Sequence, residues 1–205
     1  MLEKERKALF ERDKDYISIG ISEGGVHYGI IPVMWEGTAS AFNMRTPDIF
    51  IAPEDLLDGE IMERLESFTV YGLYIYAPLD DYGFISRFKS LQDLHIEGAR
   101  KLNSLDFLAE LVDLSMLFIE GASLDNVDLI WDIKTSGKGF MPYRNIGLYD
   151  CDVARAPSAE YPPCRFSEFL VWSRAENAQR DRELWADVVA LTKRYYLVDP
   201  DDRNL

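Results

Sequence analysis

The chain has 205 residues, of which 47% are hydrophobic, and a formal net charge of −14. This length and apolar content suffice for a sizeable core, because a folded chain of this size hides on the order of 70% of its unfolded surface. The negative charge argues against nucleic acid and anionic membranes as partners, since lysine and arginine are needed to neutralise their phosphates. A basic protein or peptide is the partner that electrostatics favours.

Residues 1–48 are predicted to form an N-terminal cap. Residues 2–14 are rich in both charge signs and fit a short surface helix. Residues 16–21 alternate apolar with polar or small residues, and a Gly-rich segment separates them from a second such run at 26–31. Two runs around a Gly-rich turn predict a β-hairpin.

The N-terminal charges lead into no apolar signal core, and no later run approaches the roughly 20 apolar residues of a membrane span. We therefore expect a cytoplasmic protein without a membrane partner.

Residues 49–65 contain a short apolar strand and a helix. Ile49–Ile51 is an apolar run, and Pro53 follows it with two acids and an apolar stripe behind them. Proline and acids in the first turn are typical of a helix start.

A six-residue phrase then occurs twice, as Leu-His-Ile-Glu-Gly-Ala at 94–99 and Leu-Phe-Ile-Glu-Gly-Ala at 117–122, so that the copies are 23 residues apart. Leu91 and Leu114 precede the two copies at the same offset. A period of this size indicates a solenoid, in which neighbouring units stack and share one core.

Related phrases begin at residues 73, 146 and 169. Together with the copies at 94 and 117, the five starts are separated by 21, 23, 29 and 23 residues. The frame Leu-x-Leu-x-x-Asn/Cys resembles that of the leucine-rich repeat family, and 146–151 ends on the expected cysteine, Cys151. The resemblance implies an α/β leucine-rich repeat solenoid over residues 49–173, with a parallel sheet on its concave side and helical or irregular returns on the convex side. It departs from the family where alanine or proline replaces the usual asparagine. By resemblance, such proteins are scaffolds for protein recognition rather than catalysts.

Residues 174–205 are predicted to form a C-terminal helical cap. Ser173 and Glu176 have the spacing of a capping box, and Leu184, Val188 and Tyr195 lie on one face of the helix that follows. The same face could serve as a dimerisation surface.

Few residues suggest chemistry. The two histidines, His27 and His95, belong to no metal-binding or catalytic motif, and Cys151 and Cys164 are better explained by a buried free thiol at Cys151 than by a disulfide. The pairs Asp80–Asp81, Asp125–Asp128 and Glu97–Glu120 could act as acid–base pairs, but in a chain with 36 acidic residues a solvated acidic face explains them better. We therefore expect no enzyme activity, no cofactor and no metal; the alternative is an enzyme with a site near His27.

Strand geometry selects the residues that would meet a partner. Successive side chains of a strand point to opposite faces, so residues between the core leucines and isoleucines should line the concave surface. The predicted partner-binding residues are Tyr74, Tyr76, His95, Glu97, Phe118, Glu120, Tyr149 and Trp172.

These residues form an aromatic and acidic strip, a composition that suits a binding surface. The function that we expect is non-catalytic protein binding, with an immunity protein or inhibitor that neutralises a cationic toxin or enzyme as the alternative. The aromatic residues could instead reflect β-propensity, or be covered by the N-terminal hairpin.

Overall fold

The structure is a computed structural model that describes residues 3–25, 47–99, 101–102, 104–125, 127–131, 143–155, 165–172, 178–186 and 195–198. The helices are α1 (Glu3–Phe10), η1 (Glu23–Gly25), η2 (Pro53–Leu57), α2 (Gly59–Glu66), η3 (Gly83–Arg87), η4 (Asp106–Glu110), α3 (Asp128–Trp131) and α4 (Ala178–Leu184), where η denotes a 3₁₀ helix. The strands are β1 (Tyr16–Ile21), β2 (Ile49–Ile51), β3 (Thr69–Ile75), β4 (Asp93–Glu97), β5 (Lys101–Leu102), β6 (Met116–Glu120), β7 (Ser123–Leu124), β8 (Tyr143–Tyr149), β9 (Asp152–Val153), β10 (Arg165–Trp172) and β11 (Tyr195–Val198).

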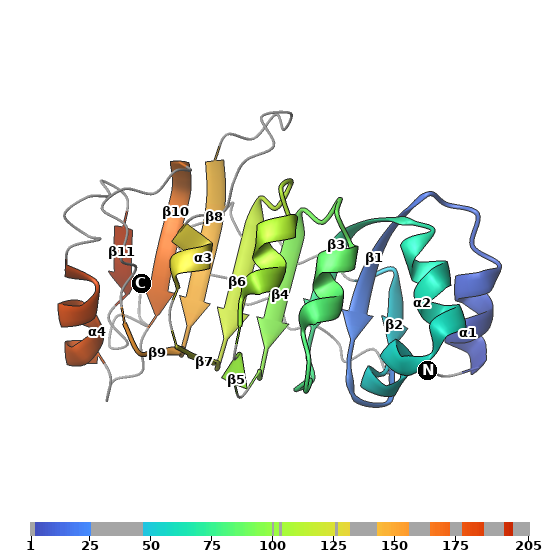
Figure 1. Ribbon diagram of the computed structural model, residues 1–205, viewed down its shortest axis with the longest axis horizontal. Coiled ribbons are helices and arrows are strands. Elements are labelled where there is room, and N and C mark those ends of the chain that lie inside the picture. Colours follow the sequence, from blue (N-terminus) through green and yellow to red (C-terminus); the bar gives the residue numbers. More distant parts are fainter. Residues whose placement is uncertain are drawn as a thin grey trace.

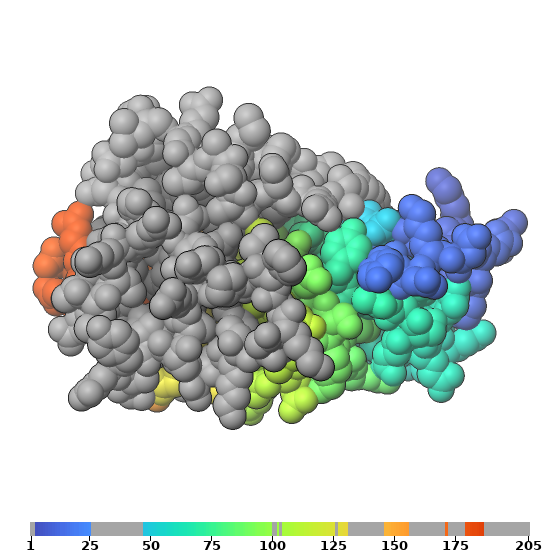
Figure 2. Space-filling view, turned by 90° about the horizontal axis from the view of Figure 1, so that it is seen from above, coloured from blue at the N-terminus to red at the C-terminus, as the bar shows by residue number. Residues whose placement is uncertain are grey.

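The protein is an α/β fold built on parallel sheets. Eight of the described strands form the main sheet in the order β11-β10-β8-β6-β4-β3-β1-β2, and every pairing between them is parallel. The short strands β5, β7 and β9 form a second parallel sheet beside the ends of β4, β6 and β8 (Figure 1). The chain progresses along the long axis of the molecule, from blue α1 at one end to orange α4 at the other (Figure 2).

The register of the main sheet places the predicted strand starts opposite one another. Leu73 pairs with Leu94, Leu94 with Leu117, Leu117 with Ile146, and Ile146 with Phe169. The two copies of the six-residue phrase therefore lie side by side without a shift. Equivalent side chains form rows that run across the sheet.

A tight turn follows each of the strands β4, β6 and β8. Gly98 and Gly121 have φ of 69° and 68°, and Asp150 takes the equivalent place with φ of 51°. This left-handed backbone favours glycine, which explains the glycine in both copies of the phrase. The amide of Gly98 donates to the carbonyl of Glu120 at 3.1 Å, so the turns also continue the ladder of hydrogen bonds.

The core lies between the main sheet and the helices α2, η3, η4 and α3, which cover one face of it (Figure 1). Leucine and isoleucine rows of the strands meet apolar residues of these helices and are fully buried. The contacting helix residues include Ile61, Ile85, Leu108 and Ile130. The short helices thus act as the returns between strands.

The predicted N-terminal hairpin is wrong. β1 lies between β2 and β3 and pairs in parallel with both, so neither of its edges is free for the run at 26–31, which lies outside the described residues. Alternation correctly indicated a strand at 16–21, but the pattern carries no information about its partners. Residues 16–21 therefore belong to the sheet rather than to a separate cap, and α1 packs beside β2 at this end.

The predicted C-terminal helix is also wrong at its end. α4 covers only Ala178–Leu184, and Tyr195–Val198 forms β11, which pairs in parallel with β10. Aromatic and β-branched residues favour strands, and pairing with β10 decides the outcome here. The capping box at 173–176 and Val188 lie outside the described residues.

The longest described helices, α1 and α2, have eight residues each. In the described part of the chain, no helix combines the length and apolar character that a membrane span requires.

Candidate functional site

The predicted strip lies on the face of the main sheet opposite the helices. The core contains Leu94 and Ile96 of β4, whereas His95 and Glu97, which alternate with them, project from the other face. The same parity holds on β6 for Phe118 and Glu120.

Backbone register brings the strip residues together in two rows. An inner row joins Tyr74, His95 and Phe118, which pair across β3, β4 and β6. An outer row joins Glu97, Glu120 and Tyr149. Trp172 is the register partner of Tyr149 on β10, but its side chain lies outside the described ones.

Aromatic rings pack against one another along these rows. The His95 ring lies edge-on to Tyr76 and Phe118, with centroids 5.8 and 4.6 Å away, and Phe118 stacks on Tyr149 at 6.4 Å. Such contacts hold the rings in fixed positions. The strip is therefore a connected layer of side chains rather than a set of independent groups.

Two members of the inner row are buried, contrary to the prediction, whereas Phe118 is half-buried. Tyr74 and His95 are each only 4% exposed. Alternation along a strand predicts which face a side chain takes, whereas exposure depends on what else packs there. Glycine contributes to this packing, because a Cβ on Gly72 would lie 3.0 Å from the Tyr74 ring.

The outer row stays partly accessible. Glu97, Glu120 and Tyr149 are half-buried, and so is Tyr76, which directly follows β3 and lies beside His95. We call these four residues the acidic row.

The two glutamates of the acidic row face each other as direct register partners. Burial raises the pKa of Glu97. Burial, followed by the charges of Glu97 and Asp150, raises the pKa of Glu120 to about 7. Two neighbouring carboxyl groups that are partly shielded from water are hard to ionise together. A positive ligand would favour their ionised forms, so this pair suits a cation.

His95 lies beside this pair with its polar atoms unsatisfied. Neither ring nitrogen has a hydrogen-bond partner within the described part of the protein. Burial lowers the pKa of His95 to about 4, which keeps the imidazole neutral at physiological pH. One donor atom from each of His95, Glu97 and Glu120 lies within 4.8 Å of the other two.

Tyr76 closes the row on the β3 side. Its hydroxyl is also buried without a hydrogen-bond partner in the described regions. Burial, together with the charges of Tyr74 and Glu97, raises the pKa of this phenol, so it remains a neutral donor.

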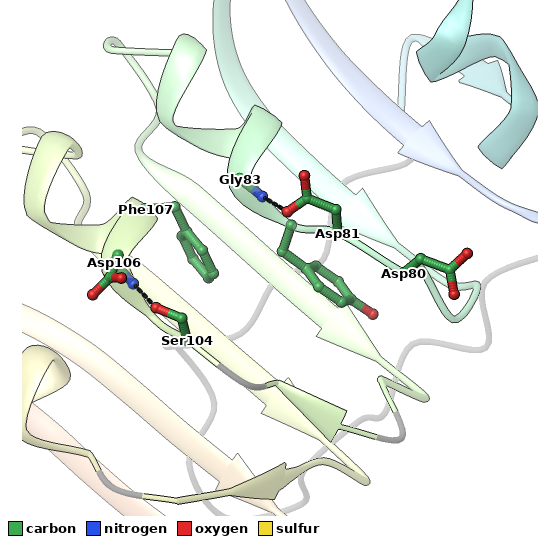
Figure 3. Close-up of a pocket in the computed structure, with 7 residues that line it drawn as sticks. Asp80, Asp81, Gly83, Ser104, Asp106 and Phe107 are labelled. Carbon is green, nitrogen blue, oxygen red and sulfur yellow. Dashed lines mark hydrogen bonds between the residues drawn. The ribbon is translucent and has the colours of Figure 1, made fainter.

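One member of each of the other acidic pairs considered from the sequence makes a structural contact. A cavity of about 280 Å³ beside η3 and η4 is lined by Asp80, Asp81, Ser104 and Asp106, among others (Figure 3). Asp81 accepts a hydrogen bond from the Gly83 amide at 2.8 Å, and Ser104 accepts one from the Asp106 amide at 3.0 Å (Figure 3). These bonds satisfy backbone donors at the two helix starts.

The remaining predicted groups lie elsewhere. Asp128 forms an ion pair with Arg155 at 2.7 Å. Cys151 is a buried free thiol, as predicted, and burial raises its pKa to about 12. Cys164 and His27 are outside the described residues.

Sequence reasoning selected His95, Glu97 and Glu120 as separate members of a strip and predicted no metal ligands. The signal that could have joined them was present: His95 and Glu97 are two apart on one strand, and the 23-residue offset aligns Glu97 with Glu120. Spacing along the chain alone does not reveal such a group, because its members come from two strands.

Fold and site together define a class, an α/β protein with a parallel sheet that carries an aromatic and acidic cluster on the face opposite α2, η3, η4 and α3. Comparisons with known protein families, curated proteins and solved structures find no match for this chain.

Proposed function

We propose that this protein is a non-catalytic protein-binding module, built as a short leucine-rich-repeat type of solenoid, and that it binds a basic protein or peptide. The solenoid is supported by the recurring order of strand, left-handed turn, short strand and helical return from β4 to β9. It is supported further by the unshifted register of the recurring phrase.

The acidic row is the observation that carries the binding proposal. Two facing carboxyl groups lie between two tyrosines on a paired sheet, where aromatic contacts hold the side chains in place. Fixed aromatic groups lose little conformational entropy on binding, and Tyr is enriched among residues that dominate binding energy.

Charge supplies the specificity. Both glutamates lack a positive neighbour that would favour their ionised form, so a lysine or arginine placed between them would lower their pKa values and form ion pairs with them. The net charge of −14 would also speed the approach of a cationic partner. The buried Tyr74 and His95 would support the row from beneath rather than touch the partner.

A sharper form of the proposal is an inhibitor or immunity protein with one cationic target. The net charge of −14 favours it, because a strongly negative surface suits a cationic target. It predicts one tight, salt-sensitive complex, whereas an adaptor would bind several partners more weakly.

The test is affinity capture from native lysate, followed by titration calorimetry with the purified partner at low and moderate salt. We expect one basic protein, bound at least about tenfold more weakly by the Glu97→Lys and Glu120→Lys variants, because each reversal places a positive charge in the acidic row. Raising the salt should weaken wild-type binding.

Glu63→Lys is the matched control, since Glu63 is an exposed acid of α2 on the other face of the sheet. It should bind like the wild type. Equal binding by all three variants, or affinity independent of salt, would place the interface elsewhere and refute the proposal.

A further inference from the structure

We propose that His95, Glu97 and Glu120 form a binding site for a divalent transition-metal cation such as Zn²⁺. This inference goes beyond protein recognition and does not require a protein partner. Its basis is the convergence of one imidazole and two carboxylates from the adjacent strands β4 and β6.

The distances suit a metal ion with small adjustments. The three donor atoms lie within 4.8 Å of one another. Bonds of about 2.1 Å to a tetrahedral Zn²⁺ would separate them by about 3.4 Å. Glutamate side chains have enough torsional freedom to close this difference of about 1.4 Å at most.

The unpartnered imidazole is the second, independent observation. His95 is 4% exposed, and both its nitrogens lack a hydrogen-bond partner among the residues whose placement is described. A buried polar group in this state is costly unless a ligand satisfies it. The neutral imidazole offers a lone pair, which is the form in which histidine binds metals.

The carboxylates show the same deficit of positive charge. No ion pair joins Glu97 or Glu120 to a lysine or arginine in the described ranges. Like charges directly opposite each other on neighbouring strands are destabilising. A divalent cation would offset both negative charges and take the histidine lone pair at the same time.

The donor set favours one class of metal. Imidazole suits Zn²⁺ and neighbouring transition metals, whereas Mg²⁺ and Ca²⁺ prefer oxygen ligands alone. Three protein ligands would leave at least one coordination position open for water. We therefore expect Zn²⁺ to bind in the presence of excess Mg²⁺.

The first test is calorimetric titration of the chelator-treated full chain with Zn²⁺ at about pH 7.5, in buffer with excess Mg²⁺ to occupy exposed acids. The wild type should bind one Zn²⁺ per chain. Glu97→Gln and Glu120→Gln should each weaken binding at least about tenfold, whereas Glu63→Gln should not. No saturable binding by the wild type, or equal affinity in all variants, would overturn the proposal.

Histidine NMR provides a second readout that needs no variant of the site. The chain has only two histidines, and a His27→Gln variant assigns their ring nitrogens. Zn²⁺ should shift a ring nitrogen of His95. A shift of His27 alone, or of neither, would overturn the proposal. Since both tests use the isolated protein, their failure would leave the proposed partner binding intact, and failure of the partner test would leave the metal site intact.

Discussion

The Glu120 carboxyl stands out at the scale of single residues. It faces Glu97 across the sheet and lies near Asp150, and its half-buried position favours the neutral form. Its folded pKa of about 7 exceeds its ordinary value, so the folded protein binds the proton more readily than the unfolded chain does. The favourable contribution of this proton is fully present below the ordinary pKa and is lost as the pH rises through about 7.

Glu120→Gln should therefore stabilise the metal-free protein at alkaline pH. Glutamine carries no charge to desolvate, so we expect a gain of about 1–2 kcal/mol at pH about 8, allowing for solvent screening, and little gain at pH about 5. Chemical denaturation with a chelator present, compared at the two pH values, measures this. A gain that does not depend on pH would show that the carboxyl is not the cause.

The turns after β4 and β6 matter at the scale of elements. Gly98 and Gly121 adopt the left-handed backbone, and a Cβ on either would meet no atom within 4 Å. The phrase therefore needs glycine for its backbone freedom and not for space.

Gly121→Ala should reduce the free energy of unfolding by about 1–2 kcal/mol, the cost of a left-handed conformation for a residue with a Cβ. Urea denaturation measures the loss. Gly59→Ala is the matched control, because Gly59 also has open space around its Cβ position but begins α2, where alanine is favourable. If both substitutions had the same effect, the left-handed turn would not explain why both copies of the phrase contain glycine.

The main sheet sets the behaviour of the whole molecule. β4 and β6 are paired on both edges and bury their leucine and isoleucine rows completely, whereas β2 has three residues and pairs only with β1 among the described strands. Stability in such an array comes from contacts between neighbouring units.

Hydrogen exchange should follow this arrangement. Amides of 94–96 and 117–119 should exchange only through global unfolding, and those of β2 should exchange faster through local fraying at the sheet edge. Mass spectrometry of peptides after timed exchange measures both. Equal protection of β2 and β6 would contradict an array that frays from its end.

The sequence by itself determined the local features of this protein: the strands at 73, 94, 117, 146 and 169, their register, and the faces taken by Leu94 and His95. These features depend on alternation within each strand and on a phrase that recurs along the chain, and both patterns are visible in the sequence. Only the tertiary structure decided that β1 lies between β2 and β3, that Tyr195–Val198 is a strand, and that His95 is buried beside two glutamates. The physical reason is that solvent exposure, and the partners of strands outside the recurring phrase, depend on contacts between distant segments, which no repeated or alternating pattern contains.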